Sequence, residues 1–238
     1  MNWIKRLFKN KDFKNEVIED LEDNEEETLF ILNHYEKNKE EVKKWDSNNL
    51  LTRLELDRQN SYKINFCFIP KNQNYKNVRS YIQYLYGDYE KWQSLRQHFI
   101  RKQNSTCQCC NRQFKDLELH EQWSFDDFDK IQKLDKLILL CKECHSIAHI
   151  TRHKKEPSKI DELLDLYCLY NKIDLSQAWK DFEFHEELRK KRNEINYQLE
   201  LFYLNQFSFN IENLFDCHTD KFNSFIYKFS TDNKDEKE

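Results

Sequence analysis

Two pairs of cysteines constrain this chain more than any other feature. Cys107 and Cys110 form the first pair and Cys141 and Cys144 the second, with two residues between the cysteines of each pair. Four thiolates in this arrangement satisfy the tetrahedral coordination of a structural zinc ion. We therefore predict that the two pairs hold one zinc ion and close a long loop, because four unrelated buried thiols would not predict both spacings.

The other four cysteines carry weaker signals. Cys109 lies inside the first pair and is an alternative ligand in place of Cys107 or Cys110, although the two-residue spacing is the commoner geometry. Cys67, Cys168 and Cys217 have no neighbours at metal-ligand spacing, which favours core or surface thiols.

Composition favours a folded, mainly helical protein. The 238 residues include one glycine and two prolines, so strong helix breakers are scarce. Aromatic residues make up 15% of the chain and supply core volume, which argues against wholesale disorder. The net charge of -4 gives no global nucleic-acid signal, so a DNA-binding surface must be local.

The eight cysteines fit a reducing compartment better than a disulfide scaffold. The first nine residues are basic but lack an apolar run long enough for a secretory signal. No stretch approaches the roughly 18–20 apolar residues that span a bilayer. We expect a cytoplasmic protein without a membrane span, and we read the first nine residues as a helix start rather than a weak membrane contact.

The chain divides into four predicted regions. Residues 1–76 form a charge-rich helical region with a short strand near 62–69. Residues 77–153 contain the cysteine–histidine module and its leading helix. Residues 154–230 are helical and rich in aromatic residues, and residues 231–238 are expected to form a disordered tail.

Patterning within these regions predicts individual elements. Residues 16–27 are strongly acidic and are interpreted as a solvated helix face or connector. Helices are predicted from about Val78 to Lys102, over Ile160–Tyr170, and from a cap at Asp174 to about Leu204. The aromatic residues of 205–229 are interpreted as packing material.

Three histidines lie close to the cysteine pairs in the sequence. His145 and His149 are four residues apart, so a helix that begins near Cys141 places them on one face, where they can hold a metal ion. For this pair alone, a packed histidine and a solvent-facing one are the simpler interpretation. The strand-like residues 117–121, which include His120, favour a metal site instead.

These motifs together resemble the HNH endonucleases. The resemblance covers residues 107–149 and consists of Cys-x₂-Cys, then Leu-Glu-Leu-His-Glu, then a second Cys-x₂-Cys followed by His-x₃-His. Residues 120–126 are similar to a bacterial HNH-like subfamily with a His-Glu-x-Trp-x-aromatic-Asp signature. The resemblance implies a small, zinc-binding ββα-metal module, and with the helical composition we expect a mainly α protein that embeds this module between helical segments.

The resemblance also implies an activity, the metal-dependent hydrolysis of DNA phosphodiester bonds. His120, His145 and His149 would hold a second divalent cation, which would be Mg²⁺, Mn²⁺ or a transition metal. This cation would stabilise charge on the phosphate and the leaving oxygen. The general base would be Glu121 in one register of the motif and His120 in the other.

One position departs from the family pattern. Lys136 stands where the family has an asparagine that orients the base, and Asp135, Gln132 or Asp126 could take over that role. The alternative function is therefore a catalytically degenerate, zinc-stabilised module that binds nucleic acid or protein.

The expected partner is DNA, and RNA is a second possibility. Helical flanks could also support a protein partner or a homo-oligomer. Four basic residues in or just after the expected metal-site helix are predicted to contact phosphates: Lys142, Arg152, Lys154 and Lys155.

Overall fold

The computed structural model describes the backbone of residues 53–235 and the side chains of residues 53–228. The chain divides into two compact units, Met1–Ser61 and Tyr62–Glu238. In the first unit, residues 53–60 are helical, whereas the basic N-terminus and the acidic segment 16–27 lie outside the described residues. No helix among the described residues is long and apolar enough to cross a membrane.

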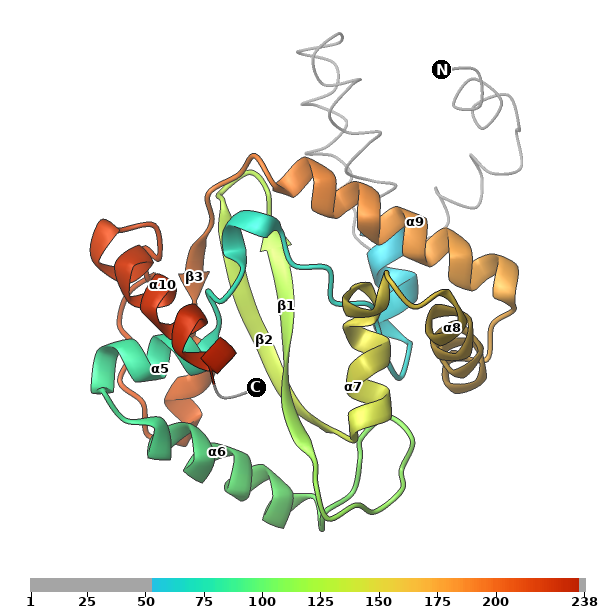
Figure 1. The fold of residues 1–238 in the computed structure, drawn as a ribbon, viewed down its shortest axis with the longest axis horizontal. Coiled ribbons are helices and arrows are strands. Elements are labelled where there is room, and N and C mark those ends of the chain that lie inside the picture. The colour runs from blue at the N-terminus through green and yellow to red at the C-terminus, as the bar shows by residue number, and fades with distance from the viewer. Residues whose placement is uncertain (1–52, 236–238) are drawn as a thin grey trace, which may run out of the picture. The chain divides into compact units, whose positions relative to one another are not determined.

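A β-hairpin forms the centre of the second unit. Strand β1 (Glu118–Asp126) pairs antiparallel with β2 (Ile131–Leu140), and the short β3 (Gln198–Glu200) pairs parallel with β2. The pairing slips by one residue after Gln122, which leaves Asp135 as the extra residue of a β-bulge. Figure 1 shows the hairpin between α5, α6 and α10 on one side and α7, α8 and α9 on the other.

The helix predicted from Val78 to Lys102 is two helices. α5 spans Val78–Tyr86 and α6 spans Tyr89–Lys102. Gly87, the one glycine of the chain, ends α5 with a left-handed φ of 62°. The side chain of Asp88 then accepts hydrogen bonds from the backbone N–H groups of Glu90 and Lys91 and starts α6.

The remaining helices lie around the hairpin. Their bounds are η1 Lys71–Gln73, α7 Lys142–Ala148, η2 Ile150–His153, α8 Pro157–Asn171, α9 Leu175–Arg192, η3 Phe202–Phe207 and α10 Asp220–Asp235. Pro157 occupies the first turn of α8, where its missing N–H has no helical partner to lose. Asp174 caps α9 through the N–H of Gln177, as predicted, but α9 ends at Arg192 rather than near Leu204, because the following residues form β3 and η3.

The segment predicted to be a strand near 62–69 bends at residues 62–64, has no regular secondary structure over 65–69, and pairs with no strand of the described chain. Its alternation is real, because Ile64, Phe66 and Phe68 are buried and the residues between them are less so. Each buried side chain packs into the core, and the Phe66 ring stacks on Tyr167 with centroids 4.1 Å apart. The alternating sequence pattern therefore indicates that one face of the segment is buried, and it does not indicate that the segment belongs to a sheet.

Aromatic residues near the C-terminus pack as predicted. The ring of Phe215 lies 4.8 Å from Tyr81, and the ring of Phe222 lies 5.0 Å from Tyr84. Helix α10 spans Asp220–Asp235 and so includes the first residues of the segment 231–238, for which we predicted disorder. About half of the described residues are helical, and they surround a small three-stranded sheet.

Candidate metal centre and adjoining cleft

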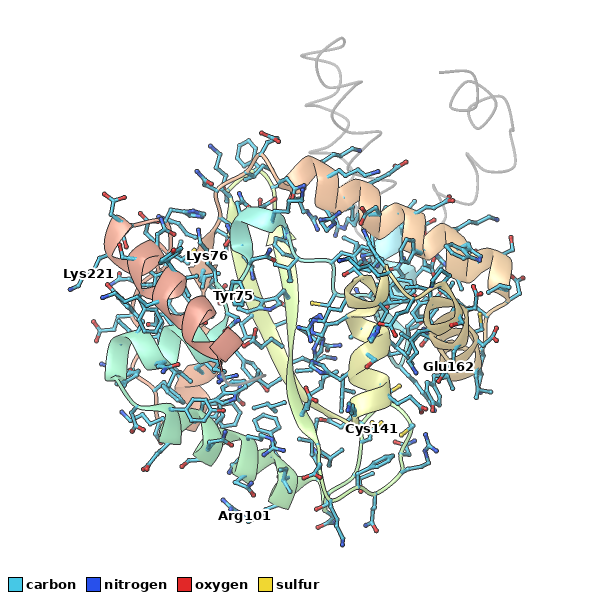
Figure 2. The ribbon with its side chains drawn as sticks, in the orientation of Figure 1. Tyr75, Lys76, Arg101, Cys141, Glu162 and Lys221 are labelled. Atoms are coloured by element: carbon cyan, nitrogen blue, oxygen red, sulfur yellow. The ribbon has the colours of Figure 1, made fainter. Side chains whose placement is uncertain are left out.

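The four cysteines of the two predicted pairs converge. Cys107 and Cys110 lie in the loop between α6 and β1, and Cys141 and Cys144 lie where β2 passes into α7. Their sulfur atoms are all within 4.8 Å of one another, and the Cys110 and Cys141 sulfurs are 4.0 Å apart. Sulfurs about 2.3 Å from a tetrahedral zinc ion would be about 3.8 Å apart, so this group has the size of a metal site. Figure 2 labels Cys141 at the start of α7, with sulfur atoms nearby.

Local backbone bonds shape the first cysteine pair. The N–H of Asn111 donates to the carbonyl of Cys107, and Asn111 adopts a left-handed φ of 58° that asparagine tolerates better than most residues. Gln108 joins this turn to β2 twice: its N–H donates to the Leu139 carbonyl, and its side-chain oxygen accepts from the Leu139 N–H. The turn is thus attached to the sheet by its backbone as well as by the cysteine group.

Hydrogen bonding among the thiols favours a thiolate at Cys107. The Cys144 thiol donates to the Cys107 sulfur, and this bond, with donation from neighbouring backbone N–H groups, lowers the pKa of Cys107 to about 4. The same bond raises the pKa of the donor, Cys144. A thiolate is the form of cysteine that binds a metal ion, so a lowered pKa at Cys107 suits the group to a cation.

The three predicted histidines also lie together. His120 comes from β1, His145 from α7 and His149 from the end of α7. The ring centroids are 4.9 Å apart for His120 and His149, 5.3 Å for His120 and His145, and 4.7 Å for His145 and His149. The strand and helix thus bring together histidines that are up to 29 positions apart in the chain.

The histidine environments differ. Burial lowers the pKa of His120 to about 3, with a further contribution from the charge of His145. Burial likewise lowers the pKa of His149, so both rings are neutral near pH 7 and can offer a lone pair to a metal. His145 is bound through Nδ1 to the Glu118 carboxylate at 2.5 Å, and this bond lowers the pKa of Glu118.

Cys67 is the site residue that the sequence did not reveal. Its sulfur and one ring nitrogen each from His120 and His149 lie within 4.8 Å of one another. Burial raises the pKa of the Cys67 thiol to about 12. The alternation around Phe66 shows only that Cys67 is less buried than Phe66 and Phe68, and nothing in the sequence indicates which element its side chain meets.

Glu121 lies beside the histidines, but its carboxylate is hydrogen-bonded to the first residue of α5. Its carboxylate accepts a 2.9 Å hydrogen bond from the N–H of Val78, the first residue of α5. Successive residues of a strand face opposite sides, so Glu121 and His120 leave β1 in different directions. Burial raises the pKa of Glu121 to about 7.

A cleft of about 680 Å³ opens onto these residues. It is lined by His120, Glu121, His145 and His149, and also by four cationic residues: Lys76, Arg79, Arg96 and Arg152. Aromatic rings of Tyr75, Tyr89, Trp92 and Trp123 line other parts of it. Figure 2 labels Tyr75 and Lys76 in the segment that precedes α5.

The basic residues predicted to contact phosphates do not form one cluster. Arg152, in η2, lines the cleft, and its charge contributes to the lowered pKa of His120. Lys142 is the first residue of α7, whereas His149 follows the last, so the two are separated by about 10 Å along the helix axis. Lys154 forms an ion pair with Glu186 at 3.2 Å, and Lys155 is exposed.

Of the three residues predicted as substitutes for the asparagine that orients the base, one lines the cleft. Gln132 is buried there, and its side-chain oxygen has no hydrogen-bond partner among the described residues. Lys136 is exposed and pairs with Gln122 in the hairpin. Asp135 accepts from the Ser124 hydroxyl, and Asp126 accepts from two N–H groups of the hairpin turn.

Comparison with known proteins adds no relative. No family model matches the chain, and no curated protein and no solved structure matches it. Conclusions about function therefore depend on the residues that line the cleft and on the cysteine group beside it.

Proposed function

We propose that this chain is a metal-dependent endonuclease that hydrolyses DNA phosphodiester bonds, with the hairpin and α7 as an HNH-type ββα-metal module. The observation that carries the proposal is the convergence of His120, His145 and His149 in a cleft lined by cationic side chains. The four-cysteine group, as a structural zinc site, would hold α7 against the hairpin that bears His120.

The residues divide the work of phosphodiester hydrolysis. A bound divalent cation would supply charge stabilisation for the phosphate and the leaving oxygen. His120 and His149 would hold that cation as neutral imidazoles, with His145 beside them on its Glu118 carboxylate. Arg96 and Arg152 would bind phosphate oxygens along the cleft.

The register with His120 as ligand and Glu121 as base agrees with two observations. The ring of His120 faces the histidines of α7. Glu121 lines the same cleft, and its pKa, raised to about 7 by burial, suits a base near neutral pH. To take a proton from water, its carboxylate would first have to release the N–H of Val78.

Plasmid cleavage tests the proposal. We expect zinc-loaded protein to nick or cut supercoiled DNA in the presence of a divalent metal, and His120→Gln or His145→Ala to lower the rate at least about 100-fold. His153→Ala is the matched control, because His153 lies in η2, pairs with Glu156 and does not line the cleft. Intact plasmid with every divalent ion, or variants of normal zinc content that cut like the parent protein, would contradict the proposal.

A second candidate function has one observation in its favour. Lys136 occupies the position of the family's orienting asparagine and points to solvent, which fits a module that has lost catalysis and retains binding. This candidate predicts salt-sensitive nucleic-acid binding without cleavage and a loss of affinity in Arg152→Gln.

A further inference from the structure

Cys67 is held against the end of α7 by its own backbone. Its N–H donates a 2.8 Å hydrogen bond to the carbonyl of Ala148, the residue before His149. Carbonyls in the last turn of a helix have no partner within the helix, so this bond satisfies one of them and fixes the spacing between the two chain segments. Cys67 is therefore placed beside His149 by contacts that do not involve its sulfur.

The segment around Cys67 is also fixed on its other face. Phe66 stacks on Tyr167 of α8, and Phe68 lies edge-on to Phe182 of α9 with centroids 5.1 Å apart. The side chain of Asn171 accepts from the N–H of Ile64 and donates to its carbonyl. Since neighbouring residues of an extended chain face opposite sides, these anchors direct Cys67 into the cleft that it lines.

The donor set at this point is one sulfur and two imidazole nitrogens. Sulfur and nitrogen ligands of a tetrahedral zinc ion would be about 3.5 Å apart, and the three donor atoms here lie within 4.8 Å, in reach of small side-chain rotations. His145 is outside this group of three, with its Nδ1 on Glu118. Three protein donors leave a coordination position for water or a phosphate oxygen.

We propose that Cys67, His120 and His149 form a second metal site, and that it selects a thiophilic divalent metal such as Zn²⁺ or Co²⁺ over Mg²⁺. Thiolate and imidazole donors suit zinc and cobalt, whereas Mg²⁺ takes oxygen ligands in octahedral geometry. The inference rests on the proposed function in naming the ion at the nuclease site, but the binding of the ion is separable from DNA cleavage.

Cobalt spectroscopy tests the ligand. The four-cysteine group is first filled with one equivalent of Zn²⁺, and the full-length protein is then titrated with Co²⁺. We expect a thiolate-to-cobalt charge-transfer band from the second site, and Cys67→Ser should abolish the band and weaken Co²⁺ binding at least about tenfold. Retained zinc is measured at the end, so that cobalt in the four-cysteine group is not counted.

Two control variants sharpen the result. Cys168→Ser replaces a half-buried thiol of α8 that belongs to neither metal group, and it should keep the band. His145→Ala should keep it as well. A parent protein without the band, or a Cys67→Ser protein that retains it at full zinc content, would overturn the assignment.

The readout separates this inference from the proposed function. A Cys67-dependent band in a protein that leaves plasmid intact would support the site and contradict the nuclease. Cleavage supported by Mg²⁺ alone, without a sulfur band for cobalt, would support the nuclease and contradict the site.

Discussion

Cys109 and Cys110 are neighbours in the chain, yet Cys110 belongs to the set of four sulfurs that lie within 4.8 Å of one another, whereas Cys109 interacts with Cys144 without belonging to that set. The turn that ends at Asn111 carries Cys107 and Cys110 toward the start of α7. Cys109 is fully buried in the core cluster. The choice among these thiols is therefore made by the backbone of one turn.

This difference predicts opposite results for two serine variants. Cys110→Ser should lose the tightly bound metal and lower the thermal midpoint, because a three-thiolate group binds zinc less firmly. Cys109→Ser should keep about one metal per chain and lose only packing stability. Metal content by mass spectrometry under native conditions checks both, and metal loss confined to Cys109→Ser would refute the ligand assignment.

Sequence patterns predicted the four paired cysteines of this centre but did not predict Cys67. The paired cysteine spacing names a set of sulfurs that the structure brings together, since both ligands of a pair lie on one local turn. Cys67 gave no such signal, because its partners His120 and His149 lie on a distant strand and helix. A ligand that is brought to its partners only by tertiary contacts cannot be recognised from residue spacing in the sequence.

At the scale of elements, sequence patterns located most helices and misplaced their ends. The apolar spacing of α5 and α6 runs through Gly87 without a break, so periodicity alone predicts one helix. The cap at Asp88 and the left-handed glycine decide the boundary. Likewise, α9 ends at Arg192, and the chain then forms β3, which pairs with β2. This pairing is a tertiary contact, which local helix propensity cannot predict.

Helix α9 carries a histidine that should make stability depend on pH. His185 lies against the rings of Phe66, Phe68 and Phe184, and burial lowers its pKa to about 4. The folded state thus favours the neutral ring, so its contribution is fully present above about pH 6.5 and is lost as the pH falls toward 4. His185→Phe should lose less unfolding free energy between pH 7 and 4 than the parent, by roughly 3 kcal/mol at most.

Denaturant titrations at several pH values measure this difference. His98→Phe is the control, because it replaces an exposed imidazole of α6 and should follow the parent protein. Both variants keep the four cysteines, so acid release of their metal is common to the comparison. Parallel curves for His185→Phe and the parent would show that this ring does not sense pH.

At the scale of the whole second unit, the cysteine group and the hydrogen bonds of Gln108 both attach the loop after α6 to β2. The flanking helices pack through separate aromatic contacts, such as Phe66 on Tyr167 and Phe222 on Tyr84. A metal ion held by the four cysteines would therefore support the loop after α6 and β2 more than the flanking helices.

Chelation should reveal this division. Removal of zinc is expected to increase amide hydrogen exchange most in residues 103–117 and α7, while α8 and α9 keep more of their protection. The thermal midpoint should fall and should recover when zinc is added back. Equal loss of protection throughout the unit would mean that the metal site and the helices unfold together, and an unchanged exchange pattern would mean that no metal is structural.

The bond between Cys67 and Ala148 also has a consequence for the order of folding. The hairpin and the four-cysteine group join residues that are close in sequence, so their loops close at little entropic cost. Cys67 must meet a helix end that lies far along the chain, and such long-range contacts form slowly. Because the contact between Cys67 and Ala148 closes a longer loop than the four-cysteine group does, we expect the four-cysteine group to form first during refolding.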